Sequence, residues 1–418
     1  MTLIKTSFFS AVITVVRMSA GFLVGKIVAV ITGAAGVALV GQFSNFISIV
    51  VNFATGAISN GVVKYTAEYQ GDETRIKNLF STAFKICFCC SILTGLLLLL
   101  FSRYFAFLLF NDYTFSYIIK WFGVTVIFYA WNTLLIAILN GRQELRKYTI
   151  VNTAGSLLSL LITSWLVYAY QLDGALLALV VSQASIFFLT ASMILRSDWF
   201  KWSFFSAAFD KAIAKKLSHY SLMAVVSILT VPVAQILVRN LVSKELGLDS
   251  AGYWQGMMRV SDAYLLIVTT SLSTYYLPKL SSLQTDFELR KEMVNGFKLI
   301  VPVVIVGCLV IYFARFLVIQ ILYTPDFLPM ESLFTWQLIG DVFKVCSFLF
   351  GYIMVAKSMT RYYIITEIVF NVGYVLLTYF FIRHFNLQGT TIAFMINYLL
   401  CLLYMIIVFR KLIFRNGQ

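Results

Sequence analysis

The sequence is poor in charge. Only 12% of its 418 residues are charged, whereas 60% are hydrophobic. A water-soluble domain carries about a quarter charged residues, so this chain has too few of them to cover a globule. Long apolar runs recur from end to end, and a helix needs about 20 apolar residues to cross a bilayer. The chain lacks the short alternating segments of a β-barrel. These features predict an all-α polytopic membrane protein.

Histidine and cysteine are also scarce. The two histidines, His219 and His384, lie far apart in the sequence, which argues against a histidine-based triad or metal centre. The cysteines all fall inside apolar runs and indicate neither a disulfide framework nor a zinc site. They are Cys87, Cys89, Cys90, Cys308, Cys346 and Cys401. We therefore expect no catalytic residues, no metal, no cofactor and no enzymatic activity.

The apolar runs divide into twelve expected membrane spans. The first run is too long for a cleavable signal peptide and continues into the second without a convincing cleavage site. The expected spans are 8–32, 37–63, 79–102, 116–140, 147–170, 174–196, 217–243, 252–276, 297–322, 332–356, 361–382 and 389–410.

Lysine and arginine are distributed unevenly between the two sets of loops. Of the 32 basic residues, 22 lie on the side that holds the N-terminus, six lie on the other side and four lie within spans. Positive residues favour cytoplasmic loops, so both termini are expected in the cytoplasm. The same bias accounts for most of the net charge of +14. The basic balance therefore indicates membrane topology rather than a nucleic-acid partner.

The two halves of the sequence resemble each other at a nearly constant offset. Pairs 215 residues apart are Lys64/Lys279, Trp121/Trp336, Arg146/Arg361, Tyr148/Tyr363 and Gly174/Gly389. A constant offset across several loops and spans indicates an internal repeat. Because each half has six spans, the repeat is expected to be parallel, with a central cavity between the halves. We predict an N-terminal lobe over 1–196, a cytoplasmic amphipathic linker over 197–216 and a C-terminal lobe over 217–418.

Seven ionisable residues lie within the expected spans. A charge in the bilayer core costs a few kcal/mol, so it normally faces a cavity or a partner. Arg259/Asp262 and Asp341/Lys344 are each three residues apart and share a helix face, so each pair either serves a ligand or neutralises itself. The seven are Arg17, Lys26, Arg259, Asp262, Asp341, Lys344 and Glu367.

Arg17 and Lys26 are half a helical turn out of phase, so at most one of them faces a central cavity. For Lys26, the alternative is a side chain that snorkels to the outer surface. Further basic residues gather at the inner mouth, where topology alone can also explain them. They are Lys64, Arg142, Arg146, Lys279, Lys357 and Arg361. Together these cations favour an anionic substrate such as a diphosphate, which arginine and lysine bind through charge-assisted hydrogen bonds.

Several strings of the sequence resemble one known family. They are AISNGVVKY (57–65), SDAYL (261–265), YYLPKLS (275–281), WQLIGDVFK (336–344) and FGYIMVAK (350–357). They are similar to the Wzx family, bacterial flippases for undecaprenyl-diphosphate-linked oligosaccharides, within the multidrug/oligosaccharidyl-lipid/polysaccharide exporter superfamily. The likeness is strongest to the branch that handles O-antigen and enterobacterial common antigen units. It implies two six-helix lobes around a central cavity and alternating access driven by a proton or sodium gradient.

The resulting hypothesis is a flippase in the bacterial inner membrane. Residues expected to bind substrate are Lys26, Lys64, Arg142, Arg146, Arg259, Lys279, Lys344, Lys357 and Arg361, and those expected to couple the ion are Asp262, Asp341 and Glu367. Expected partners are the lipid-linked glycan, membrane lipid, and a polymerase and chain-length regulator of the same pathway. Two alternatives stay open: a cation-coupled efflux antiporter of the same superfamily, and a membrane-embedded glycan polymerase, which the short outer loops disfavour.

Overall fold

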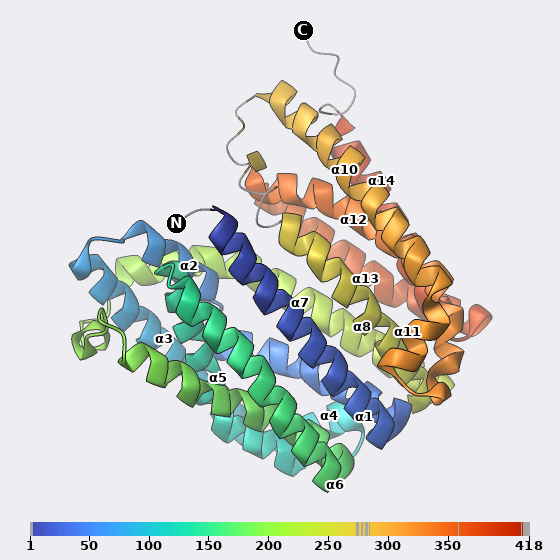
Figure 1. Ribbon diagram of the computed structural model, residues 1–418, viewed down its shortest axis with the longest axis horizontal. Coiled ribbons are helices and arrows are strands. Elements are labelled where there is room, and N and C mark those ends of the chain that lie inside the picture. The colour runs from blue at the N-terminus through green and yellow to red at the C-terminus, as the bar shows by residue number, and fades with distance from the viewer. Residues whose placement is uncertain are drawn as a thin grey trace. The chain divides into compact units, whose positions relative to one another are not determined.

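The computed structural model describes residues 3–272, 276, 279–280, 283, 285–357, 359–410 and 412, without the side chains of 3–12, 219–225, 227–228 and 271. Every regular element among these residues is a helix (Figure 1). The first are α1 (Leu3–Ala54), α2 (Ser59–Glu68), α3 (Glu73–Leu100), α4 (Ser102–Phe110), α5 (Ser116–Gly141), α6 (Leu145–Leu195), the 3₁₀ turn η1 (Trp202–Phe205) and α7 (Lys211–Leu246). After them come α8 (Leu248–Ser271), α10 (Asp286–Phe313), α11 (Arg315–Leu322), η3 (Pro325–Leu333), α12 (Phe334–Ala356), α13 (Thr360–Phe385) and α14 (Gln388–Val408).

Eight helical stretches of the described residues are long and apolar enough to cross a membrane. Two of them, in α1 and α6, contain 42 and 51 residues, and each is long enough for two crossings. A non-helical residue interrupts each of these two helices, Gly33 in α1 and Gln171 in α6. The helices α7 and α8 also reach spanning length, with 36 and 24 residues, but are more polar. The described helices therefore supply the twelve expected spans.

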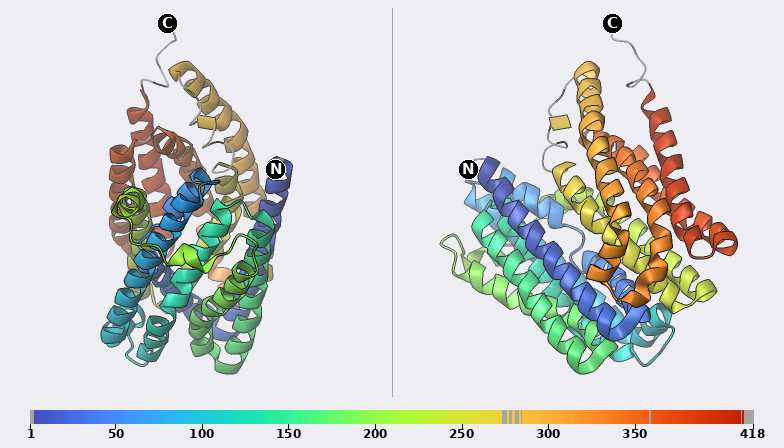
Figure 2. Two further views of the ribbon diagram at one scale, coloured as in Figure 1. Left: turned by 90° about the vertical axis from the view of Figure 1, so that its left-hand side faces the viewer. Right: turned by 45° about the vertical axis from the view of Figure 1, so that its right-hand side comes forward.

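The chain divides into two compact units. The first is Met1–Thr32 with Leu39–Leu229, and the second is Gly33–Ala38 with Thr230–Gln418. In the first unit, α3, α5 and α6 pack side by side, and in the second α12 packs against both α10 and α14 (Figure 2). The short stretch of α1 after its kink belongs to the second unit, where the Ala35 N–H donates to Asp249 Oδ1 at 3.2 Å.

The backbone confirms the internal repeat. Gln171 (φ 50°, ψ −122°) and Asn386 (φ 49°, ψ −136°) are 215 residues apart and interrupt the chain with nearly the same geometry. Gly33 and Gly247, which are 214 apart, both have positive φ values of 67° and 89°. Such backbone conformations are rare for residues other than glycine, so their recurrence at one offset reflects a duplicated structure.

The repeat extends to helix capping. Both α3 and α10 contain 28 residues. The Asp72 side chain accepts from the Arg75 N–H at 3.0 Å, and the Thr285 side chain accepts from the Glu288 N–H at 3.2 Å. Each of these caps satisfies one N–H that the first turn of a helix leaves without a partner. The third span of each unit therefore begins in the same way.

Two glycines allow the chain to turn back on itself after these interruptions. A Cβ placed at Gly174 would lie 1.9 Å from the Leu166 carbonyl oxygen, and one at Gly389 would lie 2.4 Å from that of Phe381. Both contacts are with backbone, which cannot rotate away as a side chain can. Only glycine fits at either position.

Gly174→Ala is therefore expected to destabilise the protein by about 3 kcal/mol or more, at the upper end of the usual cost of overpacking. Thermal unfolding of the purified protein in detergent measures the effect. Gly307→Ala is the matched control, because no atom lies within 4 Å of the Cβ that it adds. Equal melting temperatures for the two variants would contradict the close packing.

The segment between α6 and α7 belongs to the first unit. Its Phe204 side chain is buried. The Ala207 carbonyl accepts from Ser81 Oγ and Lys85 Nζ, both on α3, at 2.6 Å each. The first unit consequently extends past residue 196 and includes the early part of α7.

Candidate functional site

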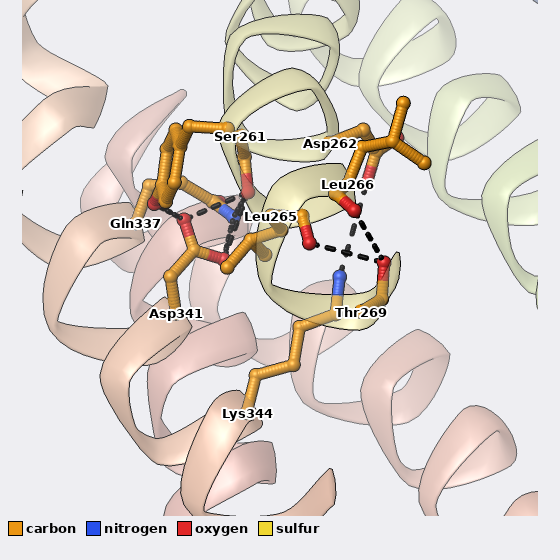
Figure 3. A network of polar contacts seen from close by, with 9 residues as sticks. Ser261, Asp262, Leu265, Leu266, Thr269, Gln337, Asp341 and Lys344 are labelled. Carbon is orange, nitrogen blue, oxygen red and sulfur yellow. Dashed lines mark hydrogen bonds and ion pairs between the residues drawn. The ribbon is translucent and has the colours of Figure 1, made fainter. Parts of the chain in front are cut away.

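Asp341 forms the centre of a buried polar network between α8 and α12. Its side chain is fully buried. Ser261 Oγ lies 2.8 and 2.7 Å from its two carboxylate oxygens, Gln337 Nε2 donates at 3.3 Å, and the Tyr264 hydroxyl donates to Oδ2. Figure 3 shows Ser261 of α8 and Gln337 of α12 directed at this carboxylate. These hydrogen bonds offset the cost of burying a charge and join the two helices.

Lys344 lies one turn further along α12 and points elsewhere. Its Nζ forms an ion pair with Asp262 Oδ1 of α8 at 3.8 Å (Figure 3). It also lies 5.6 Å from the ring centre of Phe394 and 5.8 Å from the ring centres of Phe348 and Tyr398. Cation–π contacts of this kind stabilise an ammonium group that is largely removed from water. The Lys344 side chain is 13% exposed, whereas that of Asp262 is 57% exposed.

The two same-helix pairs that the sequence suggested are not ion pairs. Among the described residues, Asp341 forms no salt bridge with Lys344, and Arg259 forms none with Asp262. The ion pair instead joins Lys344 to Asp262 across two helices. Within the described residues, neither pair therefore forms the intrahelical ion pair that a self-neutralising strut requires. A spacing of three fixes the helix face but not the rotamer, and the Asp341 and Lys344 side chains point to different partners (Figure 3).

A cavity of about 410 Å³ lies within the second unit, lined by α7, α8, α12, α13 and α14. Lys344 and Glu367 both line it, and Glu367 is the one acidic residue on its wall. The Glu367 carboxylate accepts from Thr230 Oγ1 and Asn371 Nδ2, each at 3.4 Å. Asn397, which is buried, also lines the cavity. The wall thus places one cation and one carboxylate among neutral oxygen and amide groups.

The remaining predicted residues lie outside this cavity. Lys26 is half-buried on α1, and Arg259 is half-buried on α8. Four others are exposed: Lys64, Arg146, Lys279 and Arg361. Of the twelve predicted site residues, the structure thus brings together Asp262, Asp341, Lys344 and Glu367.

Arg142 and Lys357, which are repeat partners, both contact loops. The Arg142 guanidinium lies 4.2 Å from the ring centre of Trp199, and partial burial lowers the pKa of this arginine. Lys357 Nζ donates to the Leu283 carbonyl at 2.5 Å. The same position in each unit therefore attaches a loop to the end of a span.

Sequence comparison identifies relatives along most of the chain. A profile of the polysaccharide biosynthesis protein family matches residues 41–332. Proteins named lipid III flippase from Escherichia coli (strain K12) and Shigella flexneri are each 33% identical over 376 residues, which covers 88% of this chain and 88% of each relative. The chain belongs to the polysaccharide biosynthesis protein family. This membership agrees with the resemblance found in the sequence.

Solved structures with the same fold are transporters. An inward-facing multidrug resistance transporter of the MATE family superposes with a TM-score of 0.79 at 14% identity, covering 96% of this chain and 98% of that one. The lipid II flippase MurJ in an inward closed conformation gives 0.71 at 18% identity, covering 97% and 87%. At these identities the likeness establishes the fold alone. The all-α, twelve-span architecture predicted from the sequence is confirmed.

The neutral residues that contact Asp341 and Glu367 were not predicted from the sequence. Ser261 and Tyr264 bind Asp341, while Thr230 and Asn371 bind Glu367. Each lies in an apolar span, where hydroxyl and amide groups are common and carry a weak signal. The spacing of four between Glu367 and Asn371 was a usable clue, because it places both on one helix face.

Proposed function

We propose that the chain moves an undecaprenyl-diphosphate-linked oligosaccharide from the cytoplasmic to the periplasmic leaflet of the inner membrane. The observation that carries the proposal is the 33% identity, over 88% of the chain, to proteins named lipid III flippase. The duplicated six-span units support alternating access, the mechanism of transporters with internal repeats. No bond is made or broken in such a cycle, so no catalytic group is needed.

Lys344 is the residue proposed to hold the anionic headgroup. It is the cation on the wall of the second unit's cavity, and the exposed Asp262 neutralises it. A diphosphate offers a stronger partner than a single carboxylate at 3.8 Å, because its oxygens accept several charge-assisted hydrogen bonds. Exchange of Asp262 for the headgroup would bind the substrate without leaving Lys344 unpaired. Lys26, Lys64, Arg146, Arg259, Lys279 and Arg361 remain proposed contacts along the substrate's path, as do Arg142 and Lys357.

Glu367 is the residue proposed to bind the coupling cation. Its carboxylate, the Thr230 hydroxyl and the amide oxygens of Asn371 and Asn397 are the hard ligands that Na⁺ prefers, and the carboxylate alone can carry a proton. Asp341 does not line the cavity. This placement favours Glu367 over Asp341 as the exchange site and gives Asp341 the role of fixing α12, and hence Lys344, against α8.

The proposed orientation follows from the charge bias, with both termini in the cytoplasm. The substrate would then enter on the side that carries most of the basic residues. A polymerase and a chain-length regulator of the same pathway are the proposed downstream partners, since a flipped repeat unit has to be polymerised and its length controlled.

The efflux of small molecules is a second candidate, because a multidrug resistance transporter has the same fold. A deletion strain distinguishes the two functions. We expect deletion to cause a lipid-linked oligosaccharide to accumulate on the inner leaflet and the plasmid-borne chain to reverse the accumulation. Unchanged lipid-linked intermediates together with increased drug sensitivity would contradict the flippase and favour the efflux transporter.

A further inference from the structure

The first unit contains a cavity of its own. Its volume is about 390 Å³, within the range of ligand pockets, and α1, α5 and α6 line it. Its polar wall includes Arg17, Tyr129, Asn132, Asn152 and Gln183. None of the residues that line it is acidic.

This cavity is the repeat counterpart of the cavity in the second unit. Ten of its fourteen lining residues lie on α5 and α6, and adding 215 to each number gives a residue that lines the second cavity. Three of the four on α1 correspond in the same way at an offset of 214, which is also the offset between Gly33 and Gly247. Val24 is the exception. Two pockets that correspond at thirteen of fourteen positions descend from one duplicated pocket rather than from chance packing.

The charges of the two cavities have diverged. Glu367 of the second cavity corresponds to Asn152 in the first, and Lys344 corresponds to Tyr129. Conversely, Val231 of the second cavity corresponds to Arg17. The first cavity therefore lacks the lysine and the glutamate of its counterpart and carries one arginine at a different place. The second cavity suits a cation at Glu367, whereas the first carries a single positive charge.

Arg17 has no anionic partner within the described part of its unit. It forms no ion pair there, and Tyr129 is the wall residue with which it interacts electrostatically. Asn132 adds directional donors. Its Oδ1 accepts from Thr190 Oγ1 at 2.7 Å, which leaves the Nδ2 hydrogens for a ligand. Arg17 is exposed, and a guanidinium that lines a cavity without a carboxylate on its wall can bind an anion through charge-assisted hydrogen bonds.

We infer that the first unit's cavity is an anion-binding site in which Arg17 and the Asn132 amide hold an oxyanion, a phosphate or carboxylate group. This inference rests on the proposed function, since the lipid-linked substrate is the expected source of that group. A diphosphate and an acidic sugar share the required chemistry, and so does a small free anion.

The test uses the purified full chain and two probes, inorganic pyrophosphate and glucuronate, in isothermal titration. Arg17→Ala is expected to weaken binding at least about tenfold, because a hydrogen bond to a charged group contributes about 1.5–3 kcal/mol. Asn152→Glu restores the carboxylate of the other unit and is expected to abolish binding by pairing with Arg17. Asn152→Gln is the matched control, since it changes size by the same amount without adding charge.

The probes also identify the source of the anion. Preference for pyrophosphate assigns the site to the diphosphate, preference for glucuronate assigns it to an acidic sugar, and equal affinity assigns it to a small anion. The inference would be overturned if neither probe binds the wild type. It would also be overturned if a probe binds with the same affinity to the wild type, Arg17→Ala and Asn152→Glu. Since binding to purified protein needs no transport, this result is separate from the deletion phenotype that tests the proposed function.

Discussion

Replacing Lys344 with alanine is expected to abolish surface glycan while the protein still accumulates in the membrane. The variant removes the cation from the wall of the second unit's cavity and releases an Asp262 carboxylate that is already 57% exposed. The hydrogen bonds from Ser261 and Gln337 to Asp341, which join α8 to α12, do not involve Lys344, so folding should survive. Loss of one charge-assisted contact predicts at least a tenfold fall in translocation. Immunoblotting of glycan and protein from the same cells measures both quantities.

A double variant distinguishes binding from support of the fold. If Lys344 serves only to neutralise Asp262, Lys344→Ala combined with Asp262→Asn should recover the function that the single variant lost. If Lys344 binds the headgroup, the double variant should stay inactive and Lys344→Arg should retain part of the activity. Normal surface glycan in Lys344→Ala would remove Lys344 from the site.

Replacing Glu367 with glutamine is expected to uncouple transport from the ion gradient. Glu367 is the one acidic residue on the cavity wall. The glutamine amide of the variant therefore leaves no group on that wall that can release a proton or neutralise a cation. The amide keeps the size of the side chain and can still accept from Thr230. In liposomes, we expect an imposed proton or sodium gradient to increase the transport rate of the wild type at least about tenfold more than that of the variant. This factor corresponds to the free energy of one lost hydrogen bond to a charged group.

Glu68→Gln is the control for this experiment. Glu68 is exposed on α2, so this substitution makes the same chemical change away from the cavity. Asp341→Asn tests the alternative acid. Its carboxylate is enclosed by Ser261, Tyr264 and Gln337, so we expect a change in stability rather than in gradient dependence. Equal gradient dependence in the wild type and Glu367→Gln would assign coupling to another residue.

Much of the fold was predictable because membrane spans impose a length and a composition. The breaks at Gly33, Gln171 and Asn386 fall between expected spans, where the apolar runs are interrupted. The constant offset predicted the duplication, and it recurs in the backbone angles of those breaks. The extent of the first unit was harder to predict, because it depends on how Phe204 and the Ala207 carbonyl pack on α3.

The site was predictable as a set of charges but not as a set of contacts. The sequence marked Asp341 and Lys344 as ionisable residues within a span, yet their partners Ser261 and Asp262 lie about 80 residues away in the sequence. Helical phase also allowed at most one of Arg17 and Lys26 to face a central cavity. It gave no sign that Arg17 lines a cavity inside its own unit. This position became clear only from the structure, in which residues of α1, α5 and α6 line one cavity.

The most direct test of the central claim is a leaflet assay with purified protein. The chain is reconstituted in liposomes with an undecaprenyl-diphosphate-linked oligosaccharide, and the fraction of glycan accessible to an external glycosidase is followed over time. We predict that the wild type moves glycan between leaflets, that an ion gradient accelerates this movement, and that Lys344→Ala behaves like protein-free liposomes. A wild type that leaves the glycan in its original leaflet, with or without a gradient, would contradict the account.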